Sequence, residues 1–277
     1  MAYIKYVYAY FKFYCTGLYY LFTKKNWRKI QEKELIKTLN YAIKHSRFFR
    51  DVVGDVVIDK NNVWDIIKKF PTITKETITE KQWDIYSDEV PKDYTNWRET
   101  GGSTGVPLKY PALASDYYKE DVCQMMLYHE MGFCWGDTIV YFGGDRISAE
   151  KTRNNIFWFE SNNLPYGKYI YCTRYLNEDN FQYYVESLNQ VSPKFLRGYT
   201  SSVKDFCRLV RKSDTQLKFK LKGIYLTSES ATLEDRDYIE KTLQCPVWGQ
   251  YGHTECSIFA VSKPHDSTYL TNPLYGY

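Results

Sequence analysis

A short stretch rich in glycine and hydroxyl residues is the part of the sequence best suited to chemistry. In order, it consists of Thr100, Gly101, Gly102, Ser103, Thr104 and Gly105. Glycine can adopt positive φ, which lets main-chain N–H groups close around an anion, and the hydroxyls add donors. The stretch therefore predicts a phosphate-binding loop, although a run of this composition is also typical of a plain surface turn. It is not a Walker-type P-loop, because Val106 and Pro107 stand where that loop needs Lys-Ser/Thr.

A second polar stretch, Tyr251-Gly-His-Thr-Glu255, follows about 140 residues later, after a predicted short strand at Val247-Trp248. Its carboxylate is a suitable ligand for Mg²⁺, which prefers carboxylate oxygens together with substrate phosphates. The two stretches together resemble the adenylate-forming superfamily of enzymes. Taken alone, Glu255 would be an ordinary surface carboxylate.

The resemblance implies roles for individual residues around ATP and Mg²⁺. Gly101 to Gly105 would bind the β- and γ-phosphates, with Thr100 at the start of the loop. Thr254 and Glu255 would be the catalytic residues, Thr254 at the α-phosphate and Glu255 as the metal ligand. The remaining nucleotide-binding residues implied by the resemblance are Ser228, Glu229, Ser230, Tyr251 and Gly252, with Tyr251 on the adenine and the backbone of residues 228–230 along the base.

Two N-terminal segments narrow the resemblance to one branch. Leu39–Phe49 and Phe70–Lys75 are similar to segments of the phenylacetate–CoA ligases and of the CapK-type proteins of capsule biosynthesis. This implies an ATP- and magnesium-dependent, carboxylate-activating ligase that takes a small-molecule carboxylate and serves surface-polysaccharide synthesis. The acid is left open, and so is the acceptor, coenzyme A or an amine. A non-catalytic truncated remnant, or a nucleotide-binding module, is the alternative.

Members of this family continue well beyond the position that matches Tyr277, with a hinge and a mobile lid that carries a lysine. The present sequence does not include that part. We therefore expect either a fragment or a truncated product, in which adenylation and thioester formation depend on the missing lid.

Composition limits the class of partner and the compartment. The chain has 277 residues, 44% of them hydrophobic, with 37 basic and 33 acidic residues and a net charge of +4, which does not indicate nucleic-acid binding. The seven cysteines form no Cys-x-x-Cys pair, so a reduced, cytoplasmic compartment fits best. Cys256 with His265 could form half of a metal site, but a buried thiol and a surface histidine are favoured.

The aromatic N-terminus, residues 1–22, is interrupted by Lys5 and Lys12 and is too short for a spanning helix. It predicts a helix packed on the main body, in preference to one lying on a membrane surface.

Hydrophobic periodicity predicts the elements that position these residues. Helices are expected over 27–50, 63–70, 112–133, 178–191, 202–211 and 232–243, with a further turn capped by Thr74 and with caps at Ser202 and Thr232. Strands are expected over 137–142, 194–197 (followed by a turn at Gly198), 222–226 and 247–248, while 145–175 gives no clear period.

Strands that alternate with helices predict an α/β fold with mostly parallel sheet layers flanked by helices. The resemblance makes this an adenylate-forming N-terminal domain that is incomplete at its C-terminus, with a helical region over 1–95 and a nucleotide-binding core over 96–277. Because ligands bind beyond the carboxyl ends of parallel strands, we expect Ser228 to Ser230 and Gly249 to Glu255 at one edge of the sheet.

Overall fold

The computed structural model divides the chain into two compact units, and each is described by itself. The described residues are Phe11, Cys15, 27–91, 93, 96–100, 107–112, 117–161, 167–273 and 275–276. Unit 1 comprises Met1–Glu120, Thr254–Ser257 and Pro273–Tyr277, and unit 2 comprises Asp121–His253 and Ile258–Asn272. The expected division into 1–95 and 96–277 stays a prediction.

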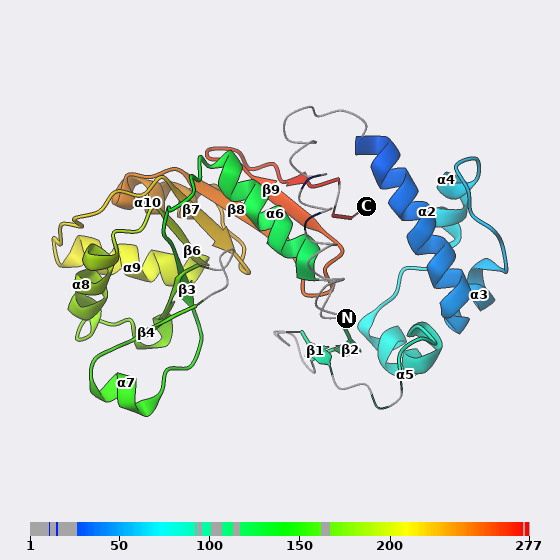
Figure 1. Cartoon of the computed structure of the whole chain (residues 1–277), viewed down its shortest axis with the longest axis horizontal. Coiled ribbons are helices and arrows are strands. Elements are labelled where there is room, and N and C mark those ends of the chain that lie inside the picture. The colour runs from blue at the N-terminus through cyan, green and yellow to red at the C-terminus, as the bar shows by residue number, and fades with distance from the viewer. Residues whose placement is uncertain are drawn as a thin grey trace. The chain divides into compact units, whose positions relative to one another are not determined.

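In its described residues, unit 1 contains helices and a β-hairpin (Figure 1). The helices are α2 (Trp27–His45), α3 (Arg47–Val53), α4 (Val63–Ile66), the 3₁₀ helix η1 (Ile67–Lys69) and α5 (Lys75–Ile85). Their small core is formed by Leu35, Leu39, Ile43, Val53, Ile58, Val63 and Ile66. The cap at Thr74 is confirmed, since its side chain accepts a hydrogen bond from the N–H of Thr77.

The helix expected over 27–50 is two helices. Ser46 adopts an extended conformation between α2 and α3, with φ −118° and ψ 120°. Its buried hydroxyl donates to the carbonyl of Asp84 at 3.0 Å, so a tertiary contact stabilises the break. His45 ends α2, with its Nδ1 2.7 Å from Oδ1 of Asp88.

The hairpin pairs β1 (Trp97–Glu99) with β2 (Lys109–Pro111) in antiparallel register. Two hydrogen bonds close its end: the N–H of Thr100 donates to the carbonyl of Leu108, and the N–H of Leu108 donates to Oγ1 of Thr100, both at 3.0 Å. The stretch expected to bind phosphate connects these strands, and its residues 101–105 lie outside the described residues.

Unit 2 is built on an eight-stranded sheet in the order β10-β9-β8-β7-β6-β3-β5-β4. The strands β5, β3, β6, β7 and β8 are parallel neighbours, and β4, β9 and β10 pair antiparallel at the two edges. Their bounds are β3 Ile139–Gly143, β4 Trp158–Glu160, β5 Tyr169–Cys172, β6 Phe195–Tyr199, β7 Gly223–Thr227, β8 Val247–Gly252, β9 Phe259–Ser262 and β10 Leu270–Thr271. The α/β fold with a mostly parallel sheet is confirmed.

Helices pack on both faces of this sheet (Figure 1). They are α6 (Tyr117–Glu130), α7 (Ala149–Arg153), the 3₁₀ helix η4 (Thr173–Tyr175), α8 (Phe181–Val191), α9 (Thr200–Lys212) and α10 (Leu233–Leu243). On one face Phe206 of α9 packs edge-on against Phe142 of β3, with ring centroids 5.2 Å apart. On the other face Tyr128 of α6 packs on Phe195 and Tyr225 at 5.6 and 5.8 Å. No described helix has both the length and the apolar composition needed to cross a bilayer.

Several expected boundaries were wrong. Gly198 is not a turn but lies inside β6, where a Cβ would come within 2.9 Å of Val203 and 3.0 Å of Phe142, so helix α9 packs closely on the strand there. Helix α9 begins at Thr200 and Ser202 does not cap it; the hydroxyl of Ser202 is 2.9 Å from Oγ1 of Thr173 instead.

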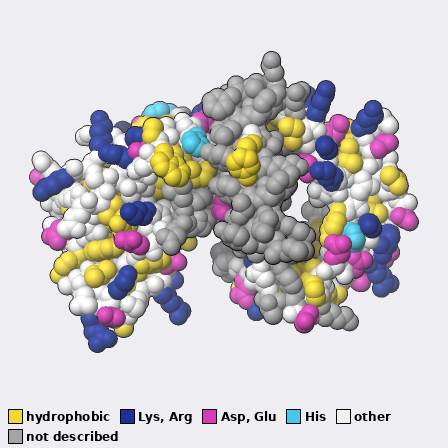
Figure 2. Space-filling model, in the orientation of Figure 1, with side chains coloured by type: hydrophobic (Ala, Val, Ile, Leu, Met, Phe, Trp, Pro, Cys, Tyr) yellow, Lys and Arg dark blue, Asp and Glu magenta, His cyan; other side chains and the backbone are white. Residues whose placement is uncertain are grey.

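The capping box of Thr232 and Asp235 on α10 is confirmed. Helix α6 ends at Glu130 and not at the expected residue 133. The region 145–175, which gave no clear period, contains α7, β4, β5 and η4. Acidic and basic side chains are mixed over the visible surface in Figure 2, in keeping with the nearly balanced charge.

Candidate functional site

Within unit 1, the base of the glycine-rich hairpin contacts the Thr254–Glu255 segment. Nη1 of Arg98, on β1, donates to the carbonyl of Thr254 at 2.9 Å and lies 3.2 Å from Sγ of Cys256. Tyr110 lies directly opposite Arg98 on β2 and lines the same cavity as Glu255. We call Arg98, Tyr110, Thr254, Glu255 and Cys256 the hairpin–motif junction. It joins two parts of the chain that are 156 residues apart in sequence.

The electrostatics of the junction keep Tyr110 as a neutral donor. Burial raises the pKa of its phenol above the ordinary value, and the negative charge of Glu255 raises the pKa further. The polar side chain of Thr254 and the positive charge of Arg98 only partly offset these effects on the pKa. The phenol therefore stays protonated at neutral pH and can donate a hydrogen bond.

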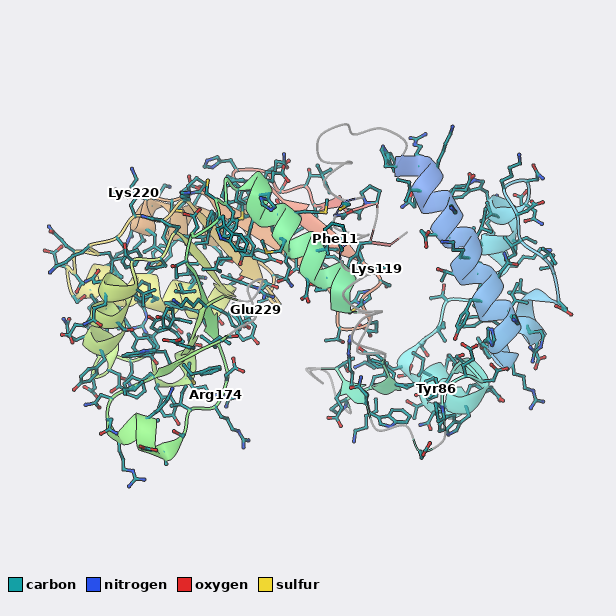
Figure 3. All side chains as sticks on the ribbon, in the orientation of Figure 1. Phe11, Tyr86, Lys119, Arg174, Lys220 and Glu229 are labelled. Atoms are coloured by element: carbon teal, nitrogen blue, oxygen red, sulfur yellow. The ribbon has the colours of Figure 1, made fainter. Side chains whose placement is uncertain are left out.

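A cavity of about 470 Å³ opens beside the junction. Its lining includes Leu108, Tyr110 and Glu255, together with Ile78 of α5 and Tyr86, which is labelled in Figure 3. The volume is in the range of small-molecule sites, and the walls are mainly apolar with few polar groups. Glu255 is exposed, and the Thr254 hydroxyl donates to its Oε2 at 3.3 Å.

The residues fit a magnesium ion only if a substrate supplies most of its ligands. Within the described residues, no group of three or more His, Cys, Asp or Glu side chains is placed to hold a metal. Glu255 lies on the wall of an open cavity, and one carboxylate is enough for Mg²⁺ when phosphate oxygens and waters complete the shell. Cys256 and His265 belong to different units, and Nε2 of His265 lies 3.4 Å from Glu240.

The other predicted nucleotide-binding residues lie at the carboxyl edge of the sheet in unit 2. Ser228 to Ser230 follow β7, and Ser228 has the unusual φ of +65°. We expected Tyr251 and Gly252 in a loop after the strand, but they are the last two residues of β8. Tyr251 is 56% exposed and meets the ring of Tyr269 edge-on at 6.4 Å. Residues 228–230, Tyr251 and Gly252 belong to unit 2, whereas Thr100, Thr254 and Glu255 belong to unit 1. The chain passes from unit 2 to unit 1 between His253 and Thr254.

Glu229, labelled in Figure 3, has a structural contact that the sequence did not indicate. Its carboxylate accepts hydrogen bonds from the backbone N–H of Ser201 at 2.7 Å and from the hydroxyl of Ser201 at 2.9 Å. Ser201 lies in the first turn of α9, where a negative charge is stabilised by the helix dipole. The side chain of Glu229 thus ties the end of β7 to the start of α9.

Arg98 and Tyr110 are the residues that the sequence prediction missed. An interpretation of Trp97–Glu99 and Lys109–Pro111 as two strands around a turn would have placed them opposite each other. That signal was available, but each strand has only three residues and gives little alternation.

Comparison with known proteins agrees with this architecture. No family model matches the sequence. The chain is 27% identical over 237 residues to Protein CapK of Staphylococcus aureus, an alignment that covers 83% of this chain and 51% of that protein. The chain is a homologue of CapK. It spans about half the length of this curated relative.

Solved structures of 2-hydroxyisobutyryl-CoA ligase share the fold. The ligase in complex with 2-HIB-AMP and CoA, in the thioesterification state, superposes with a TM-score of 0.64 at 16% identity, covering 90% of this chain and 54% of that chain. The same ligase in the postadenylation state with R3-HIB-AMP gives 0.63 at 15% identity, covering 87% and 52%. The CapK homologue therefore has the fold of the N-terminal part of an adenylate-forming ligase.

Proposed function

We propose that this CapK homologue is the nucleotide- and acid-binding part of an ATP- and Mg²⁺-dependent, carboxylate-activating ligase. The hairpin–motif junction is the observation that carries the proposal. Through Arg98 it joins β1, the strand before the glycine-rich loop, to the segment that contains Thr254 and Glu255, the two residues expected at the α-phosphate and the metal. Tyr110 of β2 and Glu255 line one cavity.

The junction positions Glu255 through the main chain. Because Arg98 binds the carbonyl of Thr254, the contact fixes the backbone beside Glu255. Mg²⁺, when bound with ATP, neutralises phosphate charge and favours departure of pyrophosphate. Glu255 would hold that ion, Thr254 would donate to the α-phosphate, and Gly101, Gly102, Ser103, Thr104 and Gly105 would bind the β- and γ-phosphates. Tyr251, Gly252 and residues 228–230 would contact the adenosine.

We take the proposed substrate and acceptor from the similar proteins. The solved ligase is named for a hydroxy acid and holds its adenylate and CoA. We extend to this chain a small carboxylic acid as substrate and coenzyme A as acceptor. We further propose a cytoplasmic role in capsule polysaccharide synthesis, which the resemblance to the CapK-type proteins implies. Residues 1–95 would form a helical region, and residues 96–277 would form the nucleotide-binding core. A nucleotide-binding module that does not activate an acid is the second candidate.

Calorimetric titration with ATP, with and without Mg²⁺, tests the proposal. Glu255→Gln keeps the shape of the side chain and removes its charge, so we expect affinity for Mg·ATP to fall by about tenfold or more and affinity for metal-free ATP to stay the same. Glu99→Gln is the matched control, because Glu99 pairs with Lys109 at 2.6 Å on the same hairpin. Equal Mg·ATP affinity in both variants would contradict the assignment of Glu255.

A further inference from the structure

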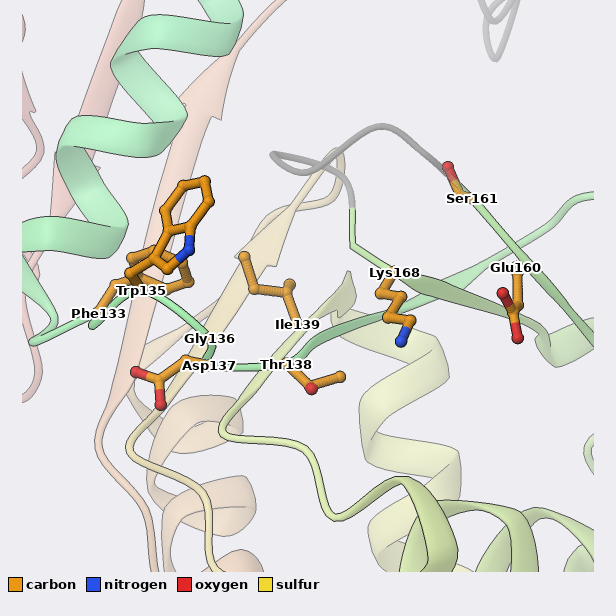
Figure 4. A pocket seen from close by; sticks show the side chains of 9 residues that line it. All are labelled: Phe133, Trp135, Gly136, Asp137, Thr138, Ile139, Glu160, Ser161 and Lys168. Atoms are coloured by element: carbon orange, nitrogen blue, oxygen red, sulfur yellow. The ribbon is translucent and has the colours of Figure 1, made fainter.

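A second cavity lies in unit 2, at the edge of the sheet opposite to Ser228 and Tyr251. Its volume is about 410 Å³, and it is lined by the turn that enters β3, by the end of β4 and by the residue before β5. Since β3 and β5 are parallel, this is the amino edge of both strands. Figure 4 shows Trp135 and Ile139 on one side of the cavity and Lys168 and Glu160 on the other.

Trp135 is exposed to solvent on a turn that hydrogen bonds and an ion pair stabilise. Its side chain is 93% exposed, and it lies between Gly132 and Gly136, whose φ angles are +89° and +98°. The N–H of Cys134 donates to Oδ2 of Asp137 at 2.8 Å, and Lys222 forms an ion pair with the same oxygen at 2.7 Å.

Burial of Asp137 raises its pKa, but the hydrogen bonds from Lys222 and Cys134 outweigh burial and bring the pKa below its ordinary value. The carboxylate therefore stays charged, and the turn presents a large aromatic surface whose removal from water is favourable.

Lys168 is fixed on the other side by a close approach of two backbones. A Cβ on Gly167, which has φ +108°, would lie only 3.0 Å from the carbonyl oxygen of Ile139. This permits the N–H of Lys168 to donate to that carbonyl at 2.8 Å. Both Lys168 and Glu160 are exposed, and in the part of the chain that the structure describes neither is within ion-pair distance of an opposite charge. The cavity thus offers one cation and one anion beside an apolar wall.

We infer that this cavity binds a free α-amino acid with an aromatic side chain. The ring would stack on Trp135 above Ile139, the carboxylate would accept from the ammonium of Lys168, and the α-ammonium would donate to Glu160. Hydrogen bonds in which the donor or the acceptor is charged are roughly twice as strong as neutral ones. A ligand with only one charge would leave one of the two side chains without a partner in the cavity.

A ligand series of the same ring tests the chemical class. Calorimetry would compare L-phenylalanine with 3-phenylpropanoate, which lacks the ammonium, with 2-phenylethylamine, which lacks the carboxylate, and with L-alanine, which lacks the ring. We expect saturable binding of L-phenylalanine and at least about tenfold weaker binding of each analogue. No saturable binding of L-phenylalanine, or equal binding of 3-phenylpropanoate, would overturn the inference.

Variants then locate the site. Trp135→Ala and Lys168→Met should each weaken L-phenylalanine about tenfold or more, and Glu160→Gln should bring its affinity toward that of 3-phenylpropanoate. Lys220→Met is the control, because Lys220 is an exposed lysine of the same unit outside this cavity (Figure 3). Trp135 is almost fully exposed, so its removal should leave the melting temperature unchanged. Wild-type affinity in folded Trp135→Ala and Lys168→Met would place the amino acid elsewhere and refute the site, whatever the result with ATP.

Discussion

The hairpin–motif junction of unit 1 and the carboxyl edge of the sheet in unit 2 position their predicted site residues differently. At the junction, Arg98 binds the backbone carbonyl of Thr254. At the sheet edge, the carboxylate of Glu229 itself makes the positioning contact, to Ser201 at the start of α9. A predicted site residue can thus be held through its backbone or through its side chain. Substitution of the side chain should affect chemistry in the first case and folding in the second.

The largest effect should come from Glu255→Gln in the full ligase reaction. If Glu255 holds the metal, carboxylate-dependent pyrophosphate exchange should fall on the order of 10²-fold, comparable to the loss of one electrostatic stabiliser of a transition state. The free energy of unfolding should change by less than about 1 kcal/mol, as for other exposed positions. Wild-type exchange by the variant at saturating magnesium would contradict the assignment of Glu255 as the metal ligand. The segment that contains Thr254 and Glu255 would then be a structural turn.

Arg98→Met tests whether positioning through the backbone matters. The variant keeps an unbranched side chain but loses the donor to Thr254, so we expect Mg·ATP affinity to fall by about tenfold. Lys109→Met on the partner strand is the control, because Lys109 pairs with Glu99 and not with the junction. Similar losses in both variants would mean that the charge of the hairpin, and not the contact with Thr254, is responsible.

Glu229→Gln tests positioning through a side chain. The amide can still accept from Ser201 but carries no charge at the first turn of α9, so unit 2 should lose about 1 kcal/mol of unfolding free energy. Denaturant titration measures this loss, and nucleotide affinity should remain within about twofold, since only the backbone of residues 228–230 is expected along the base. A large drop in nucleotide affinity with unchanged stability would mean that the side chain of Glu229 acts in binding and not in folding.

The last effect, similar in size to that of Glu229→Gln, concerns the cap of α10 and depends on pH. The carboxylate of Asp235 accepts hydrogen bonds from Lys204 and from the N–H and hydroxyl of Thr232. The bond from Lys204 has the largest effect, and together these bonds lower the pKa of Asp235 below its ordinary value of 3.8. Asp235→Asn should therefore cost about 1 kcal/mol at neutral pH. Because a lowered pKa stabilises the fold only above the unfolded value, the difference should shrink as pH falls below about 3.8, through the folded pKa. A difference that persists in acid would assign the effect to packing.

The sequence alone determined the elements whose signals are local. The capping box of Thr232 and Asp235 predicted the start of α10, and the alternation of strands and helices after residue 178 predicted the parallel sheet. These succeed because caps and hydrophobic periods depend on neighbours within a few residues. The two motifs, with the N-terminal segments, also indicated the CapK branch, and the homology to CapK confirms it.

Only the tertiary structure decided which residues support the motifs. Gly198 appears in sequence as a turn, but the packing of Val203 and Phe142 against it keeps it inside β6. Ser202 appears as a cap, yet its hydroxyl contacts Thr173 of another element. Arg98 meets Thr254 across 156 residues of sequence. Such contacts depend on long-range packing, which a single sequence does not encode in any local pattern.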